Sequence, residues 1–130
     1  MSVVSFVHEG LGNSSYLVGL GDNRAAVIDP DRSTQRYLQA AEARGWAISH
    51  VFETHLHADF VSGALELRAA AGAEVFVPEA AGVHFPHRAV RAGDTVPTAF
   101  GNVSVIASPG HTPEHSSYVV RSPESPPMLF

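Results

Sequence analysis

Residues 48–59 read Ile48-Ser49-His50-Val51-Phe52-Glu53-Thr54-His55-Leu56-His57-Ala58-Asp59. The apolar start of this stretch is typical of a buried strand, and its end places two imidazoles and a carboxylate on alternate positions. In an extended or tightly turned segment alternate residues project to one side, so His55, His57 and Asp59 can converge on one point. A helical metal motif would need ligands four residues apart instead. The stretch therefore predicts a metal site at the end of a strand.

A second motif also follows a strand-like run. Residues 103–107 are mostly apolar and lead into Ser108-Pro109-Gly110-His111-Thr112-Pro113. Pro109 and Gly110 predict a sharp turn that can aim His111 inward, and Thr112 can hydrogen-bond locally to hold the loop. Because both motifs come directly after strands, we expect His111 to meet the first cluster at one site.

Together the two motifs resemble the metallo-β-lactamase superfamily, whose hallmarks are a T-H-x-H-x-D loop and a later P-G-H-T loop. Residues 13–18 and Ala26-Val27-Ile28-Asp29-Pro30 are similar to the family's early strands, the second of which ends in an acidic residue. The resemblance implies an α/β (α+β) fold. We expect the N-terminal half of an αββα sandwich, with a mixed, mainly antiparallel sheet and helices on one face.

The resemblance also implies that the chain is incomplete as a metal site. We expect residues 1–130 to form one metallo-β-lactamase-like domain that stops before the third metal ligand. Pro127-Met128-Leu129-Phe130 looks like the strand that leads to the family's Gly-Asp pair, whose aspartate is that ligand. Asp29, Asp94 and Glu114 are nearby acids, but Asp29 matches a position beside the ligands and Asp94 lies in a turn, so neither replaces it.

Within the superfamily, residues 53–63 look most like the persulfide dioxygenases, including forms fused to rhodanese domains, and their glyoxalase II-like relatives. Dinuclear zinc members usually carry a histidine immediately after the motif's aspartate, where this chain has Phe60. A phenyl ring cannot bind a metal, so a second metal site would lack a ligand. Phe60 therefore favours a mononuclear centre.

The persulfide dioxygenases imply one Fe(II), with His55 and His111 matching the two histidine ligands. His57 and Asp59 match zinc ligands of the hydrolase relatives, and around iron we expect them to orient ligands or hold water. If Zn(II) occupies the site instead, His57 is a candidate direct ligand.

Three functions remain open. The first is a mononuclear non-heme iron persulfide dioxygenase that converts a glutathione persulfide-type substrate to sulfite and a thiol. The second is a zinc-dependent hydrolase such as hydroxyacylglutathione hydrolase, with Asp59 positioning the water. The third is an inactive fragment that needs a complementary C-terminal half.

The composition excludes some partners. Eight arginines, no lysine and thirteen acids give a net charge of −5 with no basic run, which argues against nucleic acid. The absence of cysteine rules out disulfides, thiolate ligands and a cysteine nucleophile. No apolar run could span a bilayer and the N-terminus does not resemble a leader, so we expect a cytoplasmic protein without a membrane partner. The apolar C-terminus predicts exposed surface, and hence a homo-oligomer or a complementary C-terminal segment.

Turn residues and hydrophobic periodicity predict the elements in order. We expect strands over 3–8, 14–20, 24–29, 48–53, 74–77, 95–100, 103–107 and 116–121, and helices over 34–44 and 62–71. Gly21-Asp22-Asn23 predicts a hairpin turn, and Gly45 and Gly72 predict the helix ends. Residues 78–88 are expected to form a loop, and residues 122–127 a connector.

The remaining histidines carry weaker signals. His84 and His87 lie in a Pro- and Gly-broken stretch, where a solvated role is favoured over a contact with metal or substrate. His115 could hydrogen-bond to the metal loop or simply start the next strand, and the second interpretation is favoured. His8 and His50 lie in strand patterns and are assigned no role.

Overall fold

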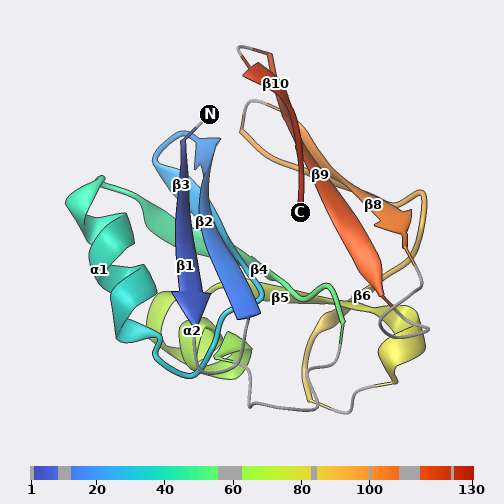
Figure 1. Ribbon diagram of the computed structural model, residues 1–130, viewed down its shortest axis with the longest axis horizontal. Coiled ribbons are helices and arrows are strands. Elements are labelled where there is room, and N and C mark those ends of the chain that lie inside the picture. Colours follow the sequence, from blue (N-terminus) through green and yellow to red (C-terminus); the bar gives the residue numbers. More distant parts are fainter. Residues whose placement is uncertain are drawn as a thin grey trace.

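The computed structural model describes residues 2–8, 13–55, 63–82, 85–99, 101–108, 115–123 and 125–130. Two β-sheets face each other, and two helices cover the outer face of the first sheet (Figure 1). The strands of the first sheet lie in chain order: β1 (Val3–His8), β2 (Asn13–Gly21), β3 (Arg24–Ile28), β4 (Ala47–Phe52), β5 (Glu74–Pro78) and β6 (Arg88–Val90). The second sheet has the order β10 (Ser125–Leu129), β9 (Ser116–Ser122), β8 (Asn102–Ala107) and β7 (Thr95–Pro97).

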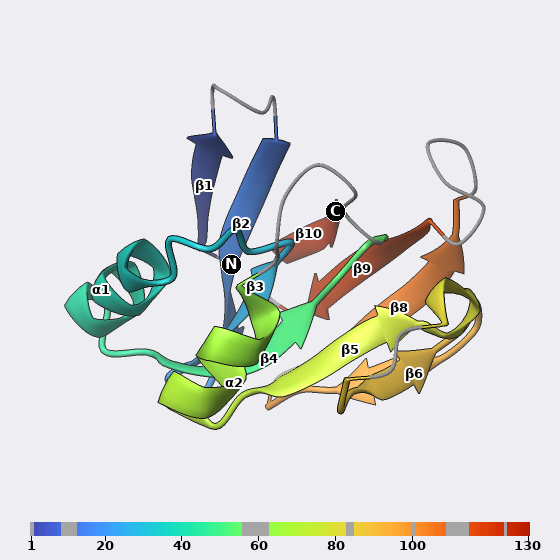
Figure 2. The same cartoon turned by 90° about the horizontal axis from the view of Figure 1, so that it is seen from below.

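The strand directions match the expected fold class. β1, β2 and β3 are antiparallel, β3 to β6 are parallel, and the second sheet is antiparallel throughout. Parallel neighbours need a crossover, which α1 (Gln35–Ala43) provides between β3 and β4, and α2 (Ala64–Ala71) between β4 and β5. Figure 2 shows β4 and β5 side by side with α2 against them. The predicted arrangement of two stacked β-sheets with helices on one face is confirmed.

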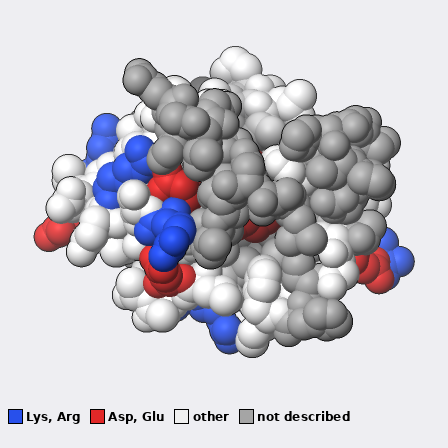
Figure 3. All heavy atoms as spheres, turned by 60° about the horizontal axis from the view of Figure 1, so that its bottom comes forward, with Lys and Arg blue, Asp and Glu red and all other residues white. Residues whose placement is uncertain are grey.

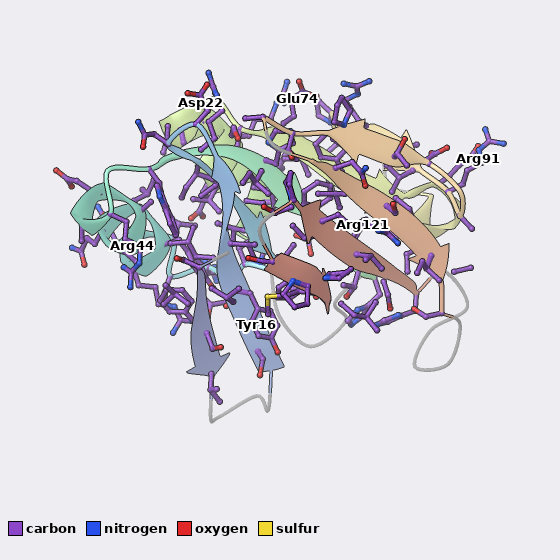
Figure 4. All side chains as sticks on the ribbon, turned by 90° about the horizontal axis from the view of Figure 1, so that it is seen from above. Tyr16, Asp22, Arg44, Glu74, Arg91 and Arg121 are labelled. Atoms are coloured by element: carbon purple, nitrogen blue, oxygen red, sulfur yellow. The ribbon has the colours of Figure 1, made fainter. Side chains whose placement is uncertain are left out.

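The core has two parts because the first sheet is buried on both faces. In β3, Ala25 and Val27 pack toward the helices, whereas Ala26 and Ile28 pack between the sheets. This explains why the strand sequence is apolar throughout rather than alternating. The C-terminal residue Phe130 also joins the inter-sheet layer, with its ring centroid 5.1 Å from that of Tyr16, which is labelled in Figure 4.

Most predicted boundaries are confirmed. Gly21, Asp22 and Asn23 all have positive φ, as a hairpin turn that matches the strand twist requires. In α2, Ala64 and Leu67 are buried against the sheet, whereas Leu65 is 42% exposed.

The edge strand β6 is not predicted from the sequence, and β10 begins two residues before the strand expected at residues 127–130. The expected loop over 78–88 and connector over 122–127 are wrong at their ends, because β6 begins at Arg88 and β10 at Ser125. β10 contains Pro126 and Pro127, which lack an N–H but are tolerated on an edge strand, and its register shifts between Ser125 and Met128. Leu129 is 67% exposed, so apolar side chains do face solvent on β10. The association expected from this surface remains a prediction.

The surface shows mixed charge. Figure 3 shows arginine and acidic side chains interspersed over the described part of one face, without a broad basic patch there. Asp22, Glu74 and Arg91 lie along one rim of the molecule in Figure 4. Across the described residues, neither helix has the length and apolarity that crossing a bilayer requires.

Candidate metal centre

The candidate site lies where the parallel strands of the first sheet end. Asp29 follows β3 directly, and Glu53, Thr54 and His55 follow β4. Because β3 and β4 are parallel neighbours, their carboxyl ends lie at the same edge of the sheet. The backbone N–H of Asp29 donates to the carbonyl of Phe52 at 2.9 Å, which places the Asp29 carboxylate beside the loop that follows β4.

Asp29 holds the start of this loop through Thr54. The Thr54 N–H donates to Asp29 Oδ1 at 2.8 Å, and the Thr54 hydroxyl donates to Asp29 Oδ2 at 2.7 Å. Asp29 has a φ of 52°, in the left-handed region that aspartate adopts more readily than most residues. Thr54 is buried, so both bonds are shielded from water. The loop therefore leaves β4 in a fixed direction.

The same threonine fixes the tautomer of His55. Thr54 Oγ1 lies 2.7 Å from His55 Nδ1. A hydroxyl carries one hydrogen, and Thr54 donates it to the Asp29 carboxylate, so His55 Nδ1 must be the donor to Thr54 Oγ1. Nδ1 then carries the hydrogen and Nε2 carries the lone pair. A neutral imidazole with its lone pair on Nε2 is the form that binds a metal.

The second sheet joins the first at this point. Ser116 at the start of β9 donates its N–H to the Thr54 carbonyl at 2.8 Å, and Ser108 after β8 donates its N–H to the His115 carbonyl at 3.0 Å. The rings of His55 and His115 stack with centroids 5.0 Å apart and an interplanar angle of 24°. The carboxyl end of β8 and the start of β9 thus reach the edge of the first sheet that carries His55.

A buried phenol closes the base of the site. The Tyr118 hydroxyl donates to the Glu53 carbonyl at 2.6 Å, and Tyr118 is fully buried. Burial raises the pKa of Tyr118 far above its ordinary value, and the negative charges of Asp29 and Glu53 raise it further. The phenol therefore stays protonated and remains a hydrogen-bond donor between the two sheets.

The structure tests only part of the predicted residue set. His55 lies at the expected strand end, whereas His57, Asp59 and His111 lie outside the described residues, as do Phe60, His84 and Glu114. Their roles remain predictions. Asp94 accepts a hydrogen bond from the Arg91 N–H at 2.9 Å within a turn, which fits its exclusion as a ligand. No group of three potential metal ligands occurs within the described part of the chain.

One described residue, His55, nevertheless has the form that a metal ligand requires. His55 presents Nε2 in the ligand tautomer, and the hydrogen on Nδ1 is held by a threonine that is itself held by a carboxylate. Partners of this kind orient metal-binding histidines and raise their basicity. His55 can therefore hold a metal ion on its Nε2.

Sequence reasoning missed several residues of this site. The motifs contain Thr54 and Ser108 but do not predict that their hydroxyls bond the histidines, and no sequence pattern predicts a role for Tyr118. The interpretation of His115 as only a strand start is incomplete, because its Nδ1 lies 2.9 Å from Ser108 Oγ and its ring meets His55. Thr54, directly before His55, was the available local signal, whereas Ser108 lies seven positions before His115.

Two other histidines have structural partners. His50 stacks on Phe52 and Phe76, with centroids 5.9 and 5.6 Å away, and its Nδ1 lies 2.7 Å from Ser49 Oγ. Burial lowers the pKa of His50. His87 Nδ1 donates to the Phe85 carbonyl at 2.7 Å, a bond within its own loop that the sequence did not predict.

The fold and the histidine loop define a class of two-sheet proteins that bind metal at the ends of their strands. A family model described as the metallo-beta-lactamase superfamily matches residues 8–126. The chain belongs to the metallo-beta-lactamase superfamily.

Individual relatives agree with this assignment. A hydroxyacylglutathione hydrolase from Hyphomonas neptunium is 35% identical over 125 residues, which cover 91% of this chain and 48% of that protein. A metallo-beta-lactamase structure from Staphylococcus aureus matches with a TM-score of 0.88 and 30% identity, over 100% of this chain and 42% of that one. ETHE1 from Myxococcus xanthus matches with a TM-score of 0.83 and 31% identity, over 91% of this chain and 53% of that one.

The chain spans less than half the length of the curated relatives it matches, with 37% and 48% coverage in the first two. Those relatives carry the name of the second function expected from the sequence, the hydrolase, rather than that of the first.

Proposed function

We propose that this chain forms the metal-binding part of a mononuclear enzyme that acts on a thiol-derived small molecule such as a glutathione conjugate. The observation that carries the proposal is the chain of hydrogen bonds from Asp29 through Thr54 to His55, which presents His55 Nε2 as a ligand. We propose His111 as a second ligand, with His57 and Asp59 beside the metal. A bound metal supplies Lewis-acid activation for hydrolysis or, as Fe(II), electron-transfer chemistry with dioxygen.

Thioester hydrolysis is the reaction that the curated relatives favour, since they are named hydroxyacylglutathione hydrolase. In this case the metal is zinc, His57 is a further ligand and Asp59 positions the attacking water. Water adds to the thioester carbonyl, the carbon–sulfur bond breaks, and the thiol and a hydroxy acid leave. The hydroxyacylglutathione hydrolase from Hyphomonas neptunium is 35% identical over nearly the whole of this chain, which supports a related substrate.

Persulfide oxidation is the second candidate, and Phe60 is the observation that favours it. Phe60 occupies the position where a second metal would need a ligand, which supports a single-metal site. The chain is also 31% identical to ETHE1 from Myxococcus xanthus over 91% of its length. In this reaction dioxygen and water convert a persulfide to a thiol and sulfite, so that the terminal sulfur is oxidised and dioxygen is reduced. His57 and Asp59 would then orient ligands rather than bind the metal.

One pair of assays separates the candidates. The chain is loaded anaerobically with zinc or with Fe(II), and each form is given a hydroxyacylglutathione thioester or, with dioxygen, glutathione persulfide. Thiol release from the thioester by the zinc form supports the hydrolase, and sulfite formation with dioxygen uptake by the iron form supports the dioxygenase. A His55→Ala variant must abolish either activity. Turnover of neither substrate would contradict an enzyme formed by this chain alone and would favour the need for a complementary segment.

A further inference from the structure

His115 meets His55 from the opposite sheet. His115 precedes β9 of the second sheet, whereas His55 follows β4 of the first. Their ring centroids lie 5.0 Å apart, and their planes are inclined by only 24°. The backbone bond from Ser116 N–H to the Thr54 carbonyl, at 2.8 Å, joins the residues immediately next to the two histidines. The ring contact is therefore set by backbone on both sides and does not depend on two long, mobile side chains.

Each ring of the pair is also held at its Nδ1 edge by a hydroxyl. Thr54 Oγ1 lies 2.7 Å from His55 Nδ1, and Ser108 Oγ lies 2.9 Å from His115 Nδ1. Ser108 Oγ is in turn 2.8 Å from Ser117 Oγ. Two chains of hydrogen bonds, one from each sheet, thus end on the two stacked rings. The start of the strand at His115 is already fixed by a backbone bond, from the Ser108 N–H to the His115 carbonyl. The side-chain bonds to the His115 ring are therefore not needed to start the strand.

We propose that His115 is a positioning residue that holds the His55 imidazole in the plane required for metal binding. The inference rests on the proposed function, since it assigns His55 as a ligand. One hydrogen bond at Nδ1 fixes the tautomer of His55 but leaves the ring able to tilt about that bond. A second ring packed against its face removes this freedom, which keeps the Nε2 lone pair on one line. His115 thereby couples the second sheet to the metal site.

His115 could act on His55 through the packing of its ring or through its nitrogens, and two variants separate these possibilities. His115→Phe keeps a planar ring against His55 but removes both nitrogens, whereas His115→Ala removes the ring as well. His87→Ala is the matched control, because it deletes a half-buried histidine whose Nδ1 bonds only within its own loop in the described structure. Unfolding by urea, measured for all three variants, shows whether each one folds.

The test is the cobalt(II) affinity and absorption spectrum of each variant. We expect His115→Ala to weaken cobalt binding by about 10-fold to 100-fold and to shift the ligand-field bands, with His115→Phe within about threefold of the parent. His87→Ala should match the parent. Unchanged binding in His115→Ala would overturn the proposal, and so would equal losses in the Ala and Phe variants, since the contact would then act through a nitrogen.

A metal-free measurement separates this inference from the proposed function. Carbon-13 relaxation of the His55 ring in the metal-free chain, at fixed pH, reports how far the ring tilts. We expect a rigid ring in the parent and in His115→Phe and a mobile ring in His115→Ala, while Thr54 keeps the Nδ1–H tautomer in all three. If the parent binds no cobalt, the proposed function fails, and the relaxation still decides the inference: a rigid His55 ring in His115→Ala overturns it.

Discussion

Asp29 and Thr54, 25 positions apart in the sequence, are joined by two hydrogen bonds, from the Thr54 N–H at 2.8 Å and from its hydroxyl at 2.7 Å. Both carboxylate oxygens of Asp29 are therefore directed at a single residue. Because the hydroxyl donates to Asp29, it can only accept from His55, and the carboxylate thus determines which nitrogen of the histidine carries the hydrogen. Asp29, at the end of β3, thus acts on His55, the proposed metal ligand, through one intervening side chain.

Replacing Thr54 by valine should weaken metal binding without removing a ligand. Valine keeps the shape of threonine but cannot accept from His55 Nδ1, so the ring loses both its tautomer preference and its orientation. We expect cobalt(II) affinity to fall by about 10-fold to 100-fold, measured by competition with a chromophoric chelator. Thr54→Ser retains the hydroxyl and should stay close to the parent. A valine variant with parental affinity would show that the hydroxyl does not orient His55.

Removing the Tyr118 hydroxyl should destabilise the junction of the two sheets. Tyr118→Phe leaves the Glu53 carbonyl without this donor, and we expect the free energy of unfolding to fall by about 1–3 kcal/mol. Urea titration at neutral pH measures the change. Tyr37→Phe is a suitable comparison, because the Tyr37 hydroxyl also has buried partners, Ser15 Oγ and the Asp31 N–H, but lies on the helix side. A Tyr118→Phe variant as stable as the parent would contradict the assigned bond.

Tyr118 should also make the protein lose stability at alkaline pH. Its pKa is raised in the folded state, so the folded chain keeps a proton that the unfolded chain releases. The stabilisation is complete below the unfolded pKa of about 10 and falls as the pH rises above that value. We expect the free energy of unfolding to drop above about pH 10 in the parent and to drop less in Tyr118→Phe. Equal slopes in the two proteins would contradict the raised pKa.

His50 should produce the opposite dependence at acidic pH. Burial lowers its pKa in the folded state, and the charges of Arg24 and Arg88 lower it further, against the opposing effect of Glu74. The unfolded chain then takes up a proton that the folded chain resists, so stability is complete above about pH 6.5 and falls as the pH drops below it. His50→Phe keeps the ring stack on Phe52 and Phe76 but removes the titration. We expect urea titrations at about pH 7.5 and about pH 5.5 to show a smaller loss in this variant.

Much of the fold could be predicted because its elements carry local signals. The Gly21-Asp22-Asn23 turn, the strand ends before Asp29 and Thr54, and the glycine stop after α2 all follow from residue type and spacing. β6 is harder to predict in this way, because it has only three residues and follows a Pro- and Gly-broken stretch. β10 is expected only from residue 127 on, because Pro126 and Pro127 argue locally against a strand at its start.

In the site, too, some residues could be predicted from local sequence and others could not. His55 was predicted from its motif, and its position at the end of β4 agrees. Thr54, which bonds His55, lies within the motif. Asp29, which holds Thr54, and His115, which packs on the ring, lie at sequence separations that the motif does not span. His115 illustrates the difference, because only the packing of β9 against the end of β4 shows that its ring meets His55.

Gly63 should be intolerant of a side chain because it lies against the loop that follows β3. A Cβ at Gly63 would collide with the Asp31 carbonyl oxygen and would lie 2.6 Å from Thr34 Cγ2. We expect Gly63→Ala to lower the free energy of unfolding by about 2–3 kcal/mol, since backbone must move. Gly72→Ala meets no neighbour and should cost only about 1 kcal/mol for its φ of 69°. Chemical denaturation of both variants tests the difference, and equal costs would contradict it.

The most direct test is the metal content of the chain purified anaerobically from cells supplied with both iron and zinc. Elemental analysis of the parent should find about one metal ion per chain, as a mononuclear site requires, and the His55→Ala/His111→Ala double variant should contain none. Iron in the parent would favour persulfide oxidation, and zinc would favour thioester hydrolysis. A parent chain free of both metals, or a double variant that retains them in full, would contradict a metal centre built on His55.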